Sequence, residues 1–299
     1  MTENMKNGDG EQCLAVWSGL YEDIPQNRNI VVEEGILEIA DNAFRNFENL
    51  ESISLPSSLK KISACAFYGC KNLKKVEMKA GIEEILDEAF SGCSSLYSID
   101  IPDTCKRIGE GCFEACASLG RVKMSESITM IGSGAFSYCF NLTDIYIPDS
   151  CVLIEFNAFA NCFSLESVKL SDNMGLLDES LFEGCRSLKT VDLPAKLVKI
   201  GRRAFKGCSS MVTLILPFGL GSIGFDAFAD CSSLQRIAIP KDVREIEDFD
   251  IFGGCDSLTD ISFGGTKEKW ESLMGRHALT VQHSDCTVST PKISFMNME

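Results

Sequence analysis

Apolar residues recur along this chain with a fixed period of 23 residues. One phenylalanine marks the same point of every repeat, and only the last interval is longer, at 24 residues. These phenylalanines are Phe44, Phe67, Phe90, Phe113, Phe136, Phe159, Phe182, Phe205, Phe228 and Phe252. Because a short fixed period indicates repeats that stack on their neighbours, the pattern predicts a repeat solenoid of ten rungs.

Each repeat contains two apolar residues separated by one residue, as in Ile145 and Ile147. This alternation predicts a strand with one buried and one exposed face. A leucine three residues earlier, such as Leu142, is expected to pack beneath the strand. A proline such as Pro148 often follows and ends the strand, because it lacks an amide donor. The spacing in the other half of the repeat predicts short extended pieces with 3-10 or helical turns.

The repeat begins near residue 30 and fades after residue 265, which predicts three parts. Residues 1–29 are expected to form an N-terminal cap with a flexible polar tip, and residues 30–265 form the solenoid. Residues 266–299 are expected to form a C-terminal cap and a loose tail. In that cap a short helix begins after Thr266, and a strand at 279–283 closes the edge of the sheet.

The unit Ile-x-x-Ile-x-x-x-Ala-Phe-x-x-Cys-x-x-Leu-x-x-Ile-x-Ile-Pro resembles the BspA-like leucine-rich repeats over about residues 30–265. The resemblance implies a right-handed coil with a parallel β-sheet on one face. It brings no catalytic residues with it. The family includes bacterial and protozoan cell-surface proteins proposed to bind host or matrix proteins, so the resemblance implies a protein partner of that kind.

Charge and hydropathy exclude two classes of partner. The net charge of -15 argues against nucleic acids and anionic membranes, because binding to phosphate rests on clustered Lys and Arg. No apolar run is long enough for membrane insertion. The first residues lack the basic-then-apolar order of a secretory signal peptide, which favours a cytoplasmic location. The family resemblance instead implies a surface or secreted location, and both stay open here.

Nine of the fifteen cysteines stand three residues after an anchor phenylalanine. Phe47 holds that position in the first repeat, which indicates an apolar position and predicts a column of buried free thiols. The cysteines lack the close pairs of a zinc site, so no metal and no cofactor is expected. Only His277 and His283 could act as a base, and the cluster His283-Ser284-Asp285-Cys286 lies in the terminal cap. The chain is therefore expected not to be an enzyme.

The outward positions of the predicted strands remain as the candidate binding surface. Their charges balance, with five cations against five acids when Asp260 is included, and Tyr146 supplies an exposed aromatic anchor. The candidate residues are Lys75, Glu77, Asp100, Arg121, Lys123, Asp144, Tyr146, Lys169, Asp192, Ile215 and Arg236. The leading hypothesis is a surface or secreted, adhesion-type protein that binds partners through this face. The alternative is an intracellular scaffold or regulator, and charge alternation across strands also stabilises a sheet without any partner.

Overall fold

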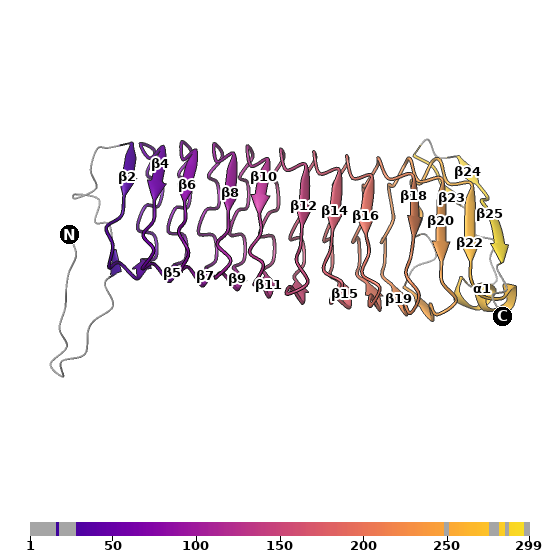
Figure 1. Cartoon of the computed structure of the whole chain (residues 1–299). Coiled ribbons are helices and arrows are strands. Elements are labelled where there is room, and N and C mark those ends of the chain that lie inside the picture. The colour runs from indigo at the N-terminus through magenta and orange to yellow at the C-terminus, as the bar shows by residue number, and fades with distance from the viewer. Residues whose placement is uncertain (1–15, 18–27, 248–250, 275–280, 285–286, 296–299) are drawn as a thin grey trace. The chain divides into compact units, whose positions relative to one another are not determined.

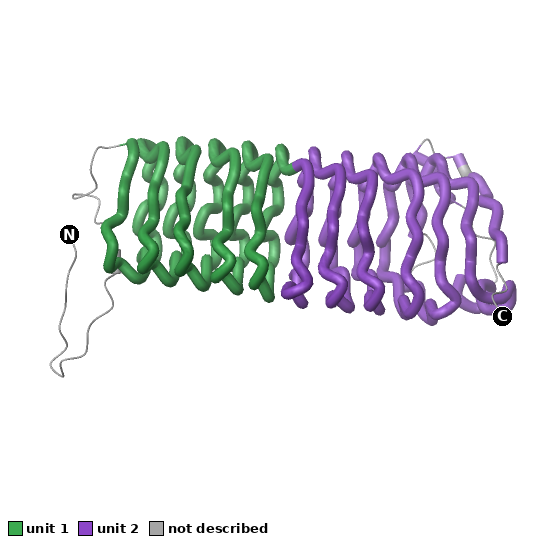
Figure 2. The backbone as a smooth tube through the Cα atoms, in the orientation of Figure 1, with its two compact units in different colours: residues 1–142 green, residues 143–299 purple. Residues whose placement is uncertain are grey.

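The computed structural model describes residues 16–17, 28–247, 251–274, 281–284 and 287–295. The chain forms two compact units, residues 1–142 and 143–299 (Figure 2). Both units repeat one 23-residue turn, and the prediction of a parallel-stranded repeat solenoid of about ten turns is confirmed (Figure 1). The division into cap, solenoid and cap stays a prediction.

The longer strand of each turn, with three or four residues, contributes to what we call sheet A. In unit 1 these strands are β2 (Asn29–Val31), β4 (Ser52–Ser54), β6 (Lys75–Glu77), β8 (Ser98–Asp100) and β10 (Arg121–Lys123). Strands β2, β4 and β6 pair in parallel, as do β8 and β10, always in a register of one repeat. The middle residue of each strand points inward, and the residues on either side of it are exposed or half-buried.

Unit 2 continues the same pattern and adds a final strand from the end of the chain. Its sheet A strands are β12 (Asp144–Tyr146), β14 (Ser167–Lys169), β16 (Thr190–Asp192), β18 (Thr213–Ile215), β20 (Arg236–Ile239), β22 (Asp260–Phe263) and β25 (Lys292–Phe295). One parallel group runs β12-β14-β16 and another runs β18-β20-β22-β25.

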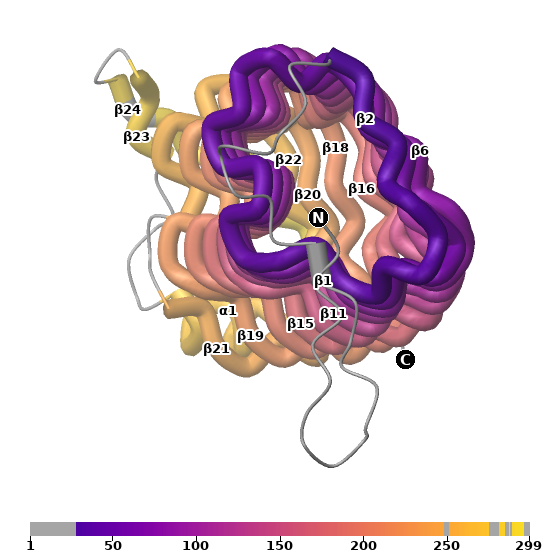
Figure 3. The backbone as a smooth tube through the Cα atoms, turned by 90° about the vertical axis from the view of Figure 1, so that its left-hand side faces the viewer, coloured from indigo at the N-terminus to yellow at the C-terminus, as the bar shows by residue number. Residues whose placement is uncertain are grey.

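A second parallel sheet, which we call sheet B, consists of two-residue strands on another side of the coil. Figure 3 shows β2 and β6 of sheet A on one side, with β1 and β11 of sheet B along the adjacent side. In unit 1 the strands are β1 (Val16–Trp17), β3 (Glu38–Ile39), β5 (Lys61–Ile62), β7 (Glu84–Ile85), β9 (Arg107–Ile108) and β11 (Met130–Ile131). In unit 2 they are β13 (Leu153–Ile154), β15 (Leu176–Leu177), β17 (Lys199–Ile200), β19 (Ser222–Ile223) and β21 (Glu245–Ile246).

The turn that carries each anchor phenylalanine is not helical, contrary to one expectation from the sequence. Within residues 28–247 the structure has no helix. The residues two before and two after the phenylalanine often have positive φ, as at Glu88 (55°) and Gly92 (72°) around Phe90. A left-handed residue at both sites breaks a right-handed helical turn. The backbone then donates to the next repeat, as from Phe90 N to Cys112 O at 2.8 Å.

The anchor phenylalanines form a stack of rings inside each unit, and all ten are fully buried. Within unit 1 the centroids of successive rings from Phe44 to Phe136 lie 4.9 to 5.3 Å apart. Within unit 2 the rings from Phe159 to Phe252 lie 5.6 to 6.0 Å apart. These side chains form the core that holds the outward face of sheet A rigid.

The predicted column of buried free thiols is confirmed for the described cysteines. In this column thiols donate to the carbonyl of the anchor phenylalanine in the preceding repeat, as from Cys93 Sγ to Phe67 O at 3.2 Å and from Cys208 Sγ to Phe182 O at 3.3 Å. Burial raises the pKa of Cys70 and of Cys116 to about 12, so both stay protonated donors at neutral pH. Cys13 and Cys286 lie outside the described residues.

The C-terminal segment confirms one expectation and corrects another. Helix α1 (Lys267–Leu273) begins after Thr266, whose side chain accepts a hydrogen bond from Lys269 N, as the sequence predicts. The expected closing strand at 279–283 is wrong: β23 (Val281–Gln282) pairs antiparallel with β24 (Val288–Ser289). The strand beside β22 is β25, at 292–295, where the sequence suggested a loose tail. Its Ile293 and Phe295 continue the alternating pattern of β22, but β25 does not follow β22 at the 23-residue period.

Candidate binding surface

All eleven candidate residues lie on sheet A strands and are exposed. Lys75 and Glu77 lie on β6, Asp100 on β8, Arg121 and Lys123 on β10, Asp144 and Tyr146 on β12, Lys169 on β14, Asp192 on β16, Ile215 on β18 and Arg236 on β20. Because the strands pair in register, equivalent side chains of successive repeats line up in rows across the sheet. The structure therefore places the set on outward faces, and its role in binding stays a prediction.

In unit 1 the outward charges of sheet A pair with one another. Lys75 Nζ lies 2.8 Å from Glu77 Oε1 on the same strand, and this hydrogen bond raises the pKa of Lys75 and lowers that of Glu77. Arg121 Nη2 lies 3.1 Å from Asp100 Oδ1 on the neighbouring strand. Both pairs are open to solvent, where an ion pair contributes little to stability. A partner that docked here would exchange these contacts at small cost.

In unit 2 the same outward positions include exposed apolar groups. The side chain of Tyr146 is 44% exposed, and Lys169 Nζ lies 5.5 Å from the centre of its ring. A cation at this distance attracts the face of the ring and fixes its orientation. Further along, Ile215 is 71% exposed. Exposed apolar groups of this size on a rigid sheet are suited to contact another protein.

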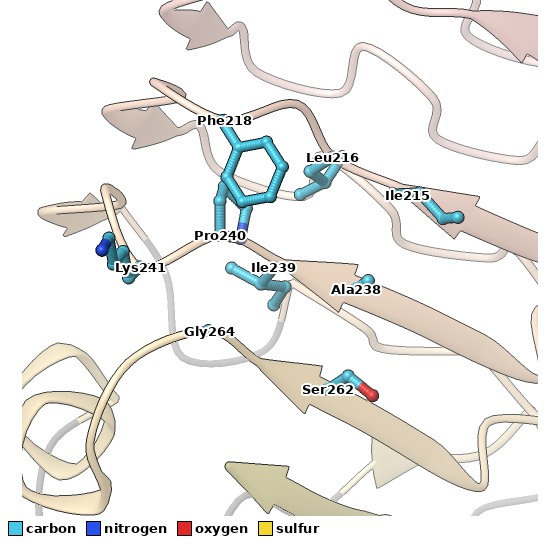
Figure 4. Close-up of a pocket in the computed structure, with 9 residues that line it drawn as sticks. All are labelled: Ile215, Leu216, Phe218, Ala238, Ile239, Pro240, Lys241, Ser262 and Gly264. Atoms are coloured by element: carbon cyan, nitrogen blue, oxygen red, sulfur yellow. The ribbon is translucent and has the colours of Figure 1, made fainter. Parts of the chain in front are cut away.

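An apolar pocket lies at the end of sheet A in unit 2, beside Ile215 (Figure 4). Its volume is about 370 Å³. The pocket lies where β18, β20 and β22 end, and it is lined by Ile215, Leu216, Phe218, Ala238, Ile239, Pro240, Lys241, Ser262 and Gly264. Sequence analysis identified only Ile215 of this set as a site residue. The repeat itself carried a signal. The position that follows the strand-ending residue is acidic in several repeats, but it is Phe218 in one of the repeats that line the pocket and Lys241 in the next.

A second group of exposed apolar side chains, which the sequence analysis missed, lies on or directly before the sheet B strands of unit 2. Leu153 and Leu176 lie on β13 and β15, and Val152 and Val198 directly precede β13 and β17. In unit 1 the positions equivalent to Leu153 and Leu176 include Glu38 and Lys61, and Glu38 Oε1 lies 2.7 Å from Lys61 Nζ. The sequence predicted only short extended pieces here and not which of their positions face outward, so this difference was not visible.

The reactive groups form no arrangement typical of a catalytic or metal site in the described parts of the chain. His283 Nδ1 lies 3.4 Å from Asp256 Oδ1, and the Ser284 hydroxyl also donates to Asp256. Serine and histidine thus share one carboxylate, which does not activate the serine. Among described residues no group of three or more His, Cys, Asp and Glu could hold a metal ion. His277, Asp285 and Cys286 lie outside them. No described helix is long and apolar enough to span a bilayer.

Comparison with known proteins agrees with the repeat pattern. The family model described as "BspA type Leucine rich repeat region (6 copies)" matches residues 37–166 and 152–274. A leucine-rich repeat protein from Bacteroides ovatus is 22% identical, with 92% of this chain and 94% of that chain covered and a TM-score of 0.53, which shows a shared fold. A leucine rich cell surface protein from Faecalibacterium prausnitzii is 23% identical, with 83% and 90% covered and a TM-score of 0.44. No match was found among curated proteins.

Proposed function

Because this chain belongs to the BspA-type leucine-rich repeat family, we propose that it is a non-enzymatic protein that binds other proteins through the outward face of sheet A. The observation that carries the proposal is the exposure of Tyr146 and Ile215 on sheet A strands of unit 2. These outward positions lie outside the core, so folding leaves much of each side chain in water. Contact with a partner would remove its surface from water.

Binding would rest on shape and charge complementarity, because the scaffold presents its side chains in fixed rows. Tyr146 supplies a large ring with few rotatable bonds, and Lys169 already holds that ring from one side. Charges of both signs on the neighbouring strands of unit 2, Lys169 and Asp192, would select the orientation of a partner and increase the association rate. Repeat proteins of this general architecture use such extended surfaces for binding.

We further propose a surface or secreted, adhesion-type role with a host or matrix protein as the partner, on the basis of the family. An intracellular scaffold is the second candidate, and the free thiols of the described cysteines favour it, because reduced cysteines persist in the cytosol. Labelling of intact source cells with a membrane-impermeant amine reagent separates the two. Label on this chain, with none on a cytosolic control, supports export. Label that appears only after lysis contradicts the adhesion role.

The binding face is tested with purified extracellular-matrix proteins and the immobilised full chain. The Tyr146→Ala variant should weaken the binding of a matrix protein roughly tenfold or more, as expected for loss of an aromatic anchor. Its melting temperature should stay unchanged, because Tyr146 lies outside the core. Val152→Ala, directly before β13 of sheet B, is the matched control and should bind as the unmodified chain does. If Tyr146→Ala binds equally well while Val152→Ala does not, the face has been assigned to the wrong sheet.

A further inference from the structure

We propose that the pocket at the end of sheet A in unit 2 receives one large apolar side chain from an acidic segment of a partner protein. This inference rests on the proposed function and narrows it, because it names the chemistry of the segment that binds. The pocket is open above the strands and lies within residues 215–264, inside one unit.

The apolar part of the pocket results from small residues beside two large exposed ones. One row across the sheet consists of register partners on β18, β20 and β22, namely Ile215, Ala238 and Ser262. The large side chain of Ile215 is thus followed by two small ones. Phe218, which is 69% exposed, stands beside Pro240 and forms one wall (Figure 4). A ring this exposed contributes little to the core, and a partner side chain placed against it would bury it.

Gly264 lines another side of the pocket, at a point where the neighbouring backbone leaves no room for a side chain. A Cβ atom at this position would lie 2.9 Å from the backbone nitrogen of Lys241, which is closer than side chains normally approach. Glycine therefore allows β22 to end close to the preceding turn. Together with Ala238 and Ser262 it leaves a volume of about 370 Å³, at the lower end of the range for ligand pockets. That size suits one large side chain of an extended segment.

Two lysines lie at the pocket, in a chain whose net charge is -15. Lys241 lines the pocket, and the Lys269 ammonium group donates a hydrogen bond to the Lys241 carbonyl. Neither lysine forms an ion pair with a described residue. The nearby acid Asp242 accepts a hydrogen bond from Gly219 N at 3.1 Å. Two lysines beside an apolar pocket favour an acidic segment.

The repeat offers a further comparison at the position of Phe218 and Lys241. Several earlier repeats carry an acid there, such as Asp103 and Asp149, whereas others carry Ser57, Ala80 and Ala195. Asp149 Oδ1 accepts a hydrogen bond from Asp172 N at 3.0 Å, and Asp103 Oδ1 accepts one from Glu126 N at 3.3 Å. A ring or an ammonium group cannot accept such a bond. Within this series of repeats, a large apolar ring and a cation occur at the position only beside the pocket.

The test uses fluorescence anisotropy with the full chain and three labelled peptides of equal length. The first peptide has one Phe flanked by Asp and Glu, the second has Gly in place of Phe, and the third has Lys in place of the acids. The first should bind at least roughly tenfold more tightly than either of the others, since each lacks one of the two matching features. Its affinity should fall at high salt, because salt screens the charges.

Two variants with matched controls locate the site. Ala238→Tyr fills the pocket with the residue that occupies the same repeat position at Tyr146. Lys241→Glu introduces the acid that occupies the same repeat position at Glu126. Each should weaken binding of the first peptide roughly tenfold or more. Ser54→Tyr and Ala80→Glu make the same changes at the same repeat positions in unit 1 and should leave the affinity unchanged.

Several results would overturn the proposal. These are equal affinity of the three peptides, no binding of the first peptide, or unchanged affinity in both pocket variants. Binding of dodecanoate with the same sensitivity to variants, but no binding of peptide, would indicate a lipid-like carboxylate instead. Self-association of the chain that Ala238→Tyr abolishes, again without peptide binding, would indicate a second copy. If the peptides fail while Tyr146→Ala still weakens matrix-protein binding, this inference fails and the proposed function stands.

Discussion

Unit 1 and unit 2 both have an anchor phenylalanine in every repeat, but the rings are packed differently in the two units. In unit 1 the ring centroids lie 4.9 to 5.3 Å apart with interplanar angles of 1 to 10°. In unit 2 they lie 5.6 to 6.0 Å apart with angles of 8 to 19°. Closer parallel rings make more dispersion contact, so the stack in unit 1 should contribute more per ring to stability.

The surfaces of the two units differ more than their cores. On sheet B, unit 1 has the ion pair Glu38–Lys61 where unit 2 has exposed Leu153 and Leu176. On sheet A, unit 1 has paired charges where unit 2 has Ile215 and the pocket beside it. Inward positions must fit the neighbouring repeats, whereas outward positions are not constrained in this way. Outward positions can therefore differ between repeats without disturbing the core.

The largest expected effect comes from removing one anchor ring in each unit. Phe90→Ala and Phe205→Ala each leave a cavity in the core and should cost about 3 to 5 kcal/mol of unfolding free energy. Phe90 lies 4.9 and 5.3 Å from its neighbours, against 5.6 and 6.0 Å for Phe205, so Phe90→Ala should cost more. Urea unfolding measures both. A larger loss for Phe205→Ala would contradict the ring comparison.

Removing one buried thiol from each unit should have a smaller effect on stability, and the effect should be equal in the two units. Cys93→Ala and Cys208→Ala each remove a buried sulfur and a thiol-to-carbonyl hydrogen bond, of 3.2 Å and 3.3 Å. Each should cost about 1 to 2 kcal/mol, and the two values should agree because each thiol is fully buried and donates the same hydrogen bond. The same urea titration measures them. A clear difference between them would mean that the units differ in more than the ring stack.

Surface substitutions should have still smaller effects on stability. These effects should depend on salt concentration for a charged residue but not for an apolar one. Arg121→Ala in unit 1 removes the ion pair with Asp100 and should cost about 0.2 to 1 kcal/mol at low salt. That loss should shrink in high salt, because the charges are then screened. Ile215→Ala in unit 2 should change stability by no more than about 0.5 kcal/mol at either salt concentration. Melting curves in both buffers check this. A salt-dependent loss for Ile215→Ala would contradict the comparison.

The smallest effect concerns pH and Glu34 at the start of unit 1. Hydrogen bonds, first of all from Ser57 N, lower the pKa of Glu34 from 4.5 to about 2. Because the pKa is lower in the folded state, the carboxylate stabilises the fold above about pH 4.5, and this contribution disappears as the pH falls toward 2. Glu34→Gln should therefore lower the melting temperature near pH 6 and have less effect near pH 3.

Glu33→Gln is the matched control for this experiment. The Glu33 side chain makes no hydrogen bond with a described residue, so its replacement should not change the pH dependence. An identical profile for Glu34→Gln and the unmodified chain would show that the hydrogen bonds of Glu34 do not contribute to stability in acid.

The core and the strand order could be predicted because each inward residue contacts its equivalents in adjacent repeats. Phe90 lies between Phe67 and Phe113, and Cys93 reaches Phe67. Such contacts repeat at one fixed sequence separation, which a period reveals. Short extended pieces were predicted where sheet B lies, but their pairing into a second sheet was not, because two-residue strands such as β5 are too short to show alternation. The left-handed residues were also hidden, since non-glycine residues such as Glu88 and Arg203 occupy them.

The sequence by itself determined the repeat, its buried residues, the thiol column and the outward position of the candidate set. The tertiary structure alone decided which strand closes sheet A, because β25 lies beyond the last repeat and pairs with β22 out of the period. It also decided the pocket, which needs Phe218, Ala238 and Gly264 from three successive turns at once. A periodic pattern fixes what each position shares with its equivalents. A site depends on how a few positions differ, and only their arrangement in space brings those differences together.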